Sequence, residues 1–226
     1  MKQNRSRLAA LLILGVLLIS GLVGGAVGKY IKTMQFNGNV TFSATLATDM
    51  VLQEHQVERK ADGDYETIAA IIPTEVDGTT VNTNQYVLLP GHDIPKDPYI
   101  KITGKTSIPA YLFVEVIDRT ANTLTYTVED HWLKLDGLTG KNGGAVYVYS
   151  TTNPVDARTP LAIDNTFAGT VNILKGNEVT VSQELRHGAS PGNLDFYACM
   201  GETAFSENSD GIEQAKEVYR KLNNMP

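Results

Sequence analysis

Residues Leu88–Ile117 have the sequence LLPGHDIPKDPYIKITGKTSIPAYLFVEVI, and this stretch decides the expected fold. In Pro98–Thr103, apolar and polar side chains alternate with a period of two, as in a strand that is buried on one face. In Ala110–Ile117 both faces are mostly apolar, which is typical of a central strand packed on two sides. Turn formers, including Pro90 and Gly91, surround these two segments. We therefore expect the other strands to be added around this pair.

Similar short segments occur along most of the chain. The further strand candidates are Asn39–Thr48, Met50–Val57, Tyr65–Ile72, Ala145–Tyr149, Glu178–Leu185 and Leu194–Met200. A helical pattern appears near the C-terminus, at about 210–223, where Ile212, Ala215, Tyr219 and Leu222 recur at helical spacing. These patterns predict an all-β fold, an antiparallel jelly-roll-like β-sandwich with a short C-terminal helix packed on its own domain.

The N-terminus has the pattern of a secretory signal peptide. Basic residues precede Leu8–Val23, an uncharged and mostly apolar segment, and Ala26 and Gly28 form a small-x-small cleavage site. We expect residues 1–28 to be removed, so that the mature chain begins at Lys29. The alternative is an uncleaved membrane anchor, for which the apolar segment is somewhat short. The mature chain then divides into an N-terminal segment, 29–39, and a sandwich domain, 40–226.

Composition excludes several classes of protein. The chain of 226 residues has a formal net charge of -6, and its signal-peptide segment contributes only basic residues, so the mature chain is more acidic still. An acidic chain without a basic patch is not expected to bind nucleic acid. The single cysteine, Cys199, excludes a disulfide scaffold. We expect Cys199 to be either a small buried hydrophobic residue or an incidental thiol.

Motifs that would indicate an enzyme are missing. The chain has neither HExxH nor GxSxG, and its four histidines are scattered singly, whereas a zinc site needs three or four converging ligands. The pairs Asp62/Asp64 and Asp93/Asp97 lack the rest of a calcium loop, so turn formation explains them better. We therefore expect no enzymatic activity, no catalytic residues, no metal site and no cofactor.

Three segments carry a resemblance to a known family. They are VTFSATLA at Val40–Ala47, LPGHD at Leu89–Asp93 and IPAYLFVEV at Ile108–Val116, and they follow the leader in this order. In this combination the chain resembles the TasA/camelysin family of exported proteins from Gram-positive bacteria, many of which have leaders processed by a SipW-type signal peptidase. The Pro-Gly-Asp often found in the family is interrupted here by His92.

The resemblance implies a jelly-roll domain and a structural role in extracellular fibres of a biofilm matrix or on the cell surface. Fibre-forming members join by donor-strand exchange, in which the N-terminal segment of one subunit completes a sheet of the next. The expected donor is Lys29–Asn39, with Tyr30, Met34 and Phe36 as its apolar plugs. The implied partners are other copies of the chain, the signal peptidase during export, and other matrix or envelope proteins.

Three alternatives stay open. The N-terminal segment would serve no assembly if it were a disordered tail or paired within its own domain. Camelysin-like members imply a cell-envelope metalloprotease instead of a fibre subunit. A third alternative is a surface adhesin or ligand-binding module that uses the long loops Pro73–Asn84 and Ser150–Thr170.

Overall fold

A computed structural model describes most of the chain after the N-terminal region. The described residues are 31–33, 40–41, 48–72, 74–76, 79–81, 84–104, 110–150, 169–185, 192–203, 206 and 211–226. The predicted signal peptide, 1–28, lies outside them, as do residues 42–47 and 151–168, which belong to the predicted strand Asn39–Thr48 and the predicted loop Ser150–Thr170. Within the described residues, no helix has the length and the apolar character that a membrane span needs.

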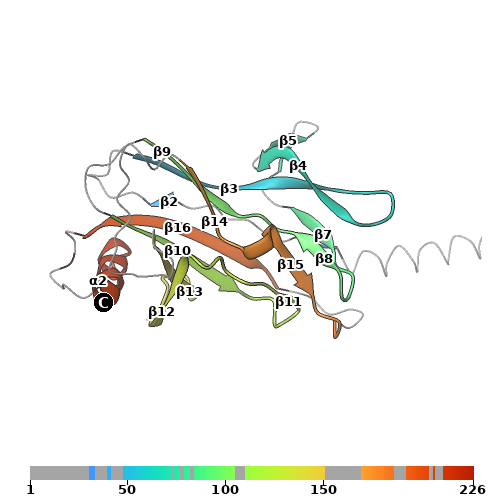
Figure 1. Ribbon diagram of the computed structural model, residues 1–226. Helices are drawn as coiled ribbons and strands as arrows, with labels where there is room; N and C mark the ends of the chain where they lie inside the picture. The colour runs from blue at the N-terminus through green and yellow to red at the C-terminus, as the bar shows by residue number, and fades with distance from the viewer. Residues whose placement is uncertain are drawn as a thin grey trace, which may run out of the picture.

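Two sheets form the body of the molecule (Figure 1). The first has the strand order β12-β13-β10-β16-β2, with bounds Trp132–Thr139, Ala145–Tyr149, Ala110–Asp118, Leu194–Glu202 and Val40–Thr41. The second has the order β14-β9-β3-β4, with bounds Gly169–Asn172, Tyr99–Gly104, Thr48–Arg59 and Tyr65–Ile72. All pairs are antiparallel except β2 with β16, which is parallel.

Smaller sheets complete the described strands. One has the order β11-β15-β8, with bounds Leu124–Thr125, Glu178–Val181 and Asp93–Pro95, and the single-turn 3₁₀ helix η1, Lys175–Asn177, precedes β15. The strands β1, Ile31–Thr33, and β7, Gln85–Val87, form a separate antiparallel pair. For Pro73–Asn84 the sequence predicts either a long loop or a short hairpin through Asp77-Gly78. The strands β5, Thr74–Val76, and β6, Thr79–Val81, form an antiparallel pair there, in agreement with the hairpin. The all-β antiparallel sandwich is confirmed, while the jelly-roll order of its strands stays a prediction.

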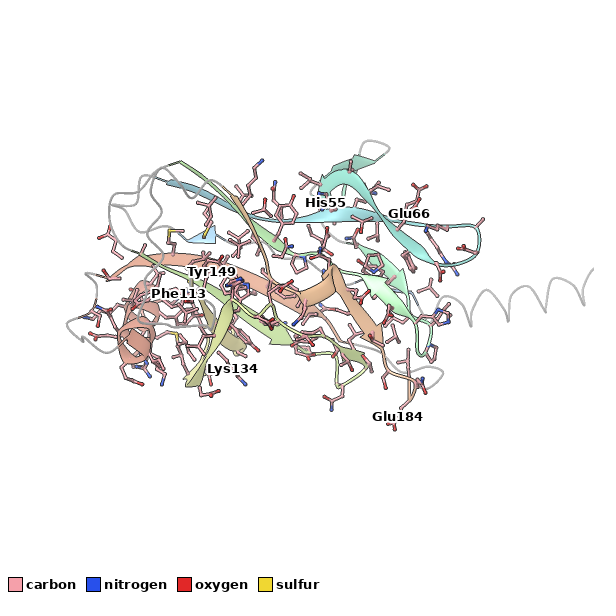
Figure 2. All side chains as sticks on the ribbon, in the orientation of Figure 1. His55, Glu66, Phe113, Lys134, Tyr149 and Glu184 are labelled. Carbon is pink, nitrogen blue, oxygen red and sulfur yellow. The ribbon has the colours of Figure 1, made fainter. Side chains whose placement is uncertain are left out.

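The strand β10 is buried on both faces, as its sequence predicted. Leu112 and Val114 belong to the main core, which lies between the two large sheets. Tyr111 and Phe113 point to the other face and belong to a second core cluster, which the helix α2, Gly211–Leu222, covers (Figure 2). This double burial places β10 in the middle of three layers.

The segments Pro98–Thr103 and Ala110–Ile117 are both strands, as predicted, but they belong to different sheets. The first segment becomes β9, which pairs with β3 and β14, and the second becomes β10, which pairs with β13 and β16. Ile100 and Ile102 of β9 nevertheless share the main core with β10. The alternating pattern specified the buried face correctly, but a face can be buried across a sandwich as well as beside a neighbouring strand.

The strand β16 runs beside β10 over its full length, from Ala110 opposite Glu202 to Asp118 opposite Leu194. Its even-numbered apolar residues enter the main core, whereas Cys199 enters the cluster under α2. Cys199 is buried and has a free thiol, so the prediction of a small buried hydrophobic residue is confirmed.

The C-terminal helix packs on its own domain, as expected. Ala215, Val218 and Tyr219 are buried against the sheet. Ile212, which was assigned to the same apolar stripe, is 42% exposed, and that assignment is wrong. Polar contacts hold the first turn instead, because the Tyr111 hydroxyl donates to the Gln214 side chain at 2.9 Å.

We predict that Leu112→Ala destabilises the protein by about 2–5 kcal/mol, because it opens a cavity in the core between the sheets. The matched control is Leu89→Ala, since Leu89 is 37% exposed whereas Leu112 is fully buried. The control is expected to change the free energy of unfolding by about 0.5 kcal/mol or less. Urea unfolding of both variants measures the difference, and equal effects would contradict the position of β10 in the core.

Candidate functional site

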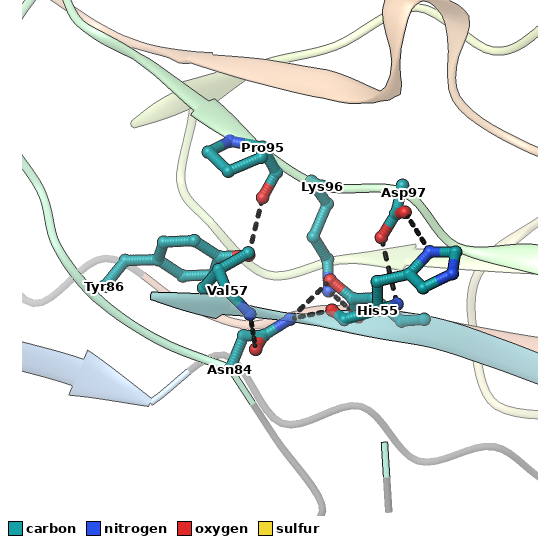
Figure 3. A network of polar contacts seen from close by, with 8 residues as sticks. His55, Val57, Asn84, Tyr86, Pro95, Lys96 and Asp97 are labelled. Carbon is teal, nitrogen blue, oxygen red and sulfur yellow. Dashed lines mark hydrogen bonds and ion pairs between the residues drawn. The ribbon is translucent and has the colours of Figure 1, made fainter. Parts of the chain in front are cut away.

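A buried ion pair lies at the centre of the candidate site (Figure 3). Glu54 comes from β3, where it follows Met50 and Leu52 on the core-facing side of the strand. Lys96 comes directly after β8, and its Nζ lies 2.6 Å from Glu54 Oε2. Both side chains are 0% exposed, so neither charge is hydrated by bulk water.

Asn84 joins the same carboxylate from a third segment, immediately before β7. Its Nδ2 donates to Glu54 Oε1 at 3.1 Å and to the carbonyl oxygen of His55 at 2.8 Å. Its Oδ1 accepts a hydrogen bond from the backbone N–H of Val57 at 2.9 Å. The ladder between β3 and β4 is irregular between His55 and Val57, so the Asn84 amide pairs backbone groups at the point where the ladder is interrupted.

Further contacts close the site around Glu54, Asn84 and Lys96, which we call the Glu54 network. The Asp97 carboxylate accepts a hydrogen bond from the His55 backbone and lies 2.6 Å from His55 Nδ1. The Tyr86 hydroxyl donates to the carbonyl oxygen of Pro95 at 2.6 Å. Burial raises the pKa of Tyr86 well above its ordinary value, and the charge of Glu54 adds to the effect.

The aromatic ring of Phe196 lies beside the ion pair, with its centroid 5.8 Å from Lys96 Nζ. A cation near an aromatic face gains a modest electrostatic attraction, which is larger where water is excluded. Burying two charges is costly, and their attraction offsets this cost only with close geometry and additional hydrogen bonds. The network meets both conditions. It is closed to bulk water, so it is suited to chemistry among its own groups and not to capture of a large substrate.

A second buried carboxylate, Glu115, points to the other face of β10. Its Oε1 accepts hydrogen bonds from the backbone N–H groups of Asn142 at 2.9 Å and Gly144 at 2.8 Å. Its Oε2 accepts from Asn142 Nδ2 and from the Tyr219 hydroxyl, both at 3.0 Å. A Cβ at Gly140 would overlap the carboxyl group of Glu115, so the turn between β12 and β13 needs glycine at this close approach.

The Glu115 site connects the sheet to α2 and has a clear effect on nearby titratable groups. Burial raises the pKa of the Tyr219 hydroxyl, and the negative charges that Cys199 and Glu115 can carry raise it further. Burial also raises the pKa of the Cys199 thiol to about 12, against a weak opposing contact from the Asn223 side chain. Both groups therefore stay protonated near neutral pH, as a structural role requires.

The residues predicted for cleavage and assembly lie outside the described part of the chain. These are Ala26, Gly28, Lys29, Tyr30, Met34 and Phe36. The intervening residues Ile31–Thr33 are described and form β1, which pairs with β7 of the same chain. Residues 31–33 of the predicted donor segment thus pair within their own domain, as one of the alternatives had it, and the three plugs are not tested.

The acidic pairs contact protein groups, and two of the described histidines, His55 and His92, contact carboxylates. Asp62 accepts a hydrogen bond from the backbone of Asp64, which confirms a turn, and Asp93 accepts one from the Thr180 hydroxyl. His55 lies against Asp97, while His187 is outside the described residues. Across the described ranges, no three His, Cys, Asp or Glu residues are grouped as metal ligands would be.

Sequence reasoning missed the Glu54 network, although a signal was present. Met50, Leu52 and Glu54 are spaced two residues apart in one strand, so their side chains lie on the same face. This spacing predicts that Glu54 faces the core with the other two. A carboxylate in such a position requires a buried partner. The sequence did not indicate which cation would supply it, because Lys96 lies in a proline-rich connection without a periodic pattern.

Comparison with known proteins returned no match to a family model, to a curated protein or to a solved structure.

We predict that Cys199 reacts with a thiol reagent at pH 8 at least 100-fold more slowly in the folded protein than in urea. A thiol with a pKa of about 12 has roughly 10³-fold less thiolate at this pH than one with an ordinary pKa near 9. The folded state holds this proton more tightly, so the associated stability is present below about pH 9 and is lost as the pH rises toward 12. Absorbance-monitored labelling checks the rate, and equal rates in the folded and unfolded states would contradict the burial.

Proposed function

We propose that the chain is a secreted structural subunit that joins to copies of itself through its N-terminal strand, in fibres of an extracellular matrix or on the cell surface. The structural support is that β7 accepts a short strand. Within one chain β1 pairs with it, with Ile31 opposite Val87 and Thr33 opposite Gln85, and an identical strand from another copy would fit the same register. Support for export comes from the signal-peptide pattern of residues 1–28. The proposed role needs no catalytic step and no cofactor.

The pair of β1 and β7 is well suited to exchange. It spans three residues and forms a sheet separate from the two large ones, so its release disturbs few other hydrogen bonds. A vacated strand edge presents unpaired N–H and C=O groups, which an identical strand from another copy satisfies equally well. Exchange of an identical element between copies therefore costs little free energy.

The acceptor side is held in place by the body of the protein. Tyr86 of β7 is fully buried, as is Leu88 just beyond it, and both belong to the main core. The Tyr86 hydroxyl is bonded to Pro95, which ends β8. An acceptor edge fixed in this way loses little conformational entropy when a donor strand binds.

The donor strand lies close to the predicted cleavage site after Gly28, with Ile31 as its first described residue. Removal of the leader would leave a short free end directly before β1. Processing by the signal peptidase would thus precede assembly, and other matrix or envelope proteins with a compatible strand would be further partners.

The test uses cysteines placed at opposite positions of the two strands. Thr33→Cys and Gln85→Cys are made in separate chains, mixed at high concentration at an ionic strength of about 0.15 M, and oxidised. Opposite residues of antiparallel strands have Cα atoms about 4.5–5.5 Å apart, within the range of a disulfide. We expect a disulfide-linked dimer of the two different chains on non-reducing gels, and filaments of the unmodified mature protein by electron microscopy.

The control mixes Lys32→Cys with Gln85→Cys, because a shift of one residue directs the side chain to the opposite face. It is expected to give much less linked dimer. The native thiol contributes little to the background, since Cys199 is buried. If the matched mixture gives no more dimer than the control, and the double variant closes only within one chain at every concentration, strand exchange is wrong.

A further inference from the structure

We propose that Lys96 and Asn84 form an intramolecular isopeptide bond, with Glu54 transferring the protons and ammonia as the leaving group. The three side chains are almost completely buried, with exposed fractions of 0% for Lys96 and Glu54 and 3% for Asn84. One carboxylate holds both reactants, since Oε2 of Glu54 lies 2.6 Å from Lys96 Nζ and Oε1 lies 3.1 Å from Asn84 Nδ2. This cross-link is independent of the proposed assembly.

The nucleophile is brought to the amide by the fold itself. Lys96, Glu54 and Asn84 come from three different segments, and their contacts converge on the Glu54 carboxylate (Figure 3). Holding reactants together in this way replaces a bimolecular encounter with a unimolecular step, which makes otherwise slow reactions accessible. An amide is a poor electrophile, so such placement is required here.

The Asn84 amide is bound in a manner that favours attack at its Cγ. The backbone N–H of Val57 donates to Oδ1 at 2.9 Å, so it is placed to stabilise the negative charge that develops on this oxygen. The leaving nitrogen, Nδ2, is held by the His55 carbonyl at 2.8 Å and faces the Glu54 carboxylate. The same carboxylate that accepts a proton from the amine can therefore return one to the leaving group.

The step balances without an oxidant or a co-reactant. Lys96 gives a proton to Glu54, and the free amine attacks Cγ of Asn84 to form a C–N bond. The C–Nδ2 bond then breaks as Glu54 protonates Nδ2. Of the three ammonium protons, one stays on the new amide nitrogen, one leaves in ammonia and one is left on the Glu54 carboxyl.

The surroundings protect this reaction from water. The Phe196 ring lies near Lys96 Nζ, and Tyr86 is fully buried in the same region. Exclusion of water strengthens the electrostatic contacts and prevents hydrolysis of the amide as a competing reaction. The reaction also replaces two buried charges by a neutral amide and a neutral carboxyl group, which removes a desolvation cost.

The Glu115 site supplies an internal comparison. Its carboxylate also accepts a hydrogen bond from an asparagine Nδ2, that of Asn142, at 3.0 Å. The other described partners of Glu115 are backbone N–H groups and the Tyr219 hydroxyl, and a lysine is not among them. Asn142 is therefore expected to remain unmodified.

Trypsin digestion of the purified folded protein tests the cross-link at the peptide level. Between Lys60 and Lys96 the chain has no Lys or Arg, so an unlinked chain gives peptide 61–96. A linked Lys96 is not cleaved, and we expect peptide 61–101 with a mass lower by one ammonia, about 17 Da. A second protease that cuts before Asp93 should leave the two pieces joined, which a succinimide at Asn84 would not do.

Variants identify the groups that react. Lys96→Arg keeps the cation and the trypsin site but should release peptide 61–96 at its full mass, and Glu54→Gln should do the same because it removes the proton acceptor. The matched controls Lys101→Arg and Asn142→Ala should retain the link. The proposal is overturned if the folded unmodified chain releases peptide 61–96 at full mass, or if the mass deficit persists in Lys96→Arg. The first outcome needs no variant to fold.

Discussion

The two-sided burial of β10 is the constraint on which the rest of the structure depends. One face must be covered by an opposing sheet and the other by a helix, because both carry large apolar side chains. The same strand also carries Glu115, a charge that the helix-facing side can bury only with complete hydrogen bonding. Gly144 and Asn142 of the β12–β13 turn and the hydroxyl of Tyr219 supply these bonds. The strand thus fixes the position of the turn and of α2 together.

Local patterns in the sequence were sufficient for most strands. Tyr65–Ile72 and Ala145–Tyr149 have the bounds that were expected, since each is a short segment bounded by turn formers. Partner strands were not predictable in the same way. Alternation specifies which side of a strand is buried, whereas β9 and β10 show that the covering layer can be an opposing sheet instead of a neighbour. The prediction that Ile212 is buried failed for a related reason, because helical spacing does not indicate where the sheet beneath a helix begins.

The candidate site was harder to predict than the fold, because it depends on contacts between distant segments. Glu54, Asn84 and Lys96 come from a strand, the residue before a strand and a proline-rich connection. Each one alone resembles an ordinary surface residue. The one indication was that Glu54 shares a strand face with its apolar neighbours, which predicts that it faces the core. This pattern does not identify its partner. The resemblance to exported fibre proteins drew attention to the N-terminal segment instead, and part of that segment does lie beside the network, as β1 on β7.

The position of β1 has a mechanical consequence. Tension applied to the N-terminal end would enter the folded body through β7, which is the pairing partner of β1. Asn84, directly before β7, accepts a hydrogen bond from the backbone of β3, and the Tyr86 hydroxyl bonds β7 to the end of β8. The force would pass through these two contacts. A pull on the N-terminus would therefore reach the second large sheet through the hydrogen bonds between Asn84 and β3. The N-terminal strand is thus attached to the body through β7, which its own buried contacts hold in place.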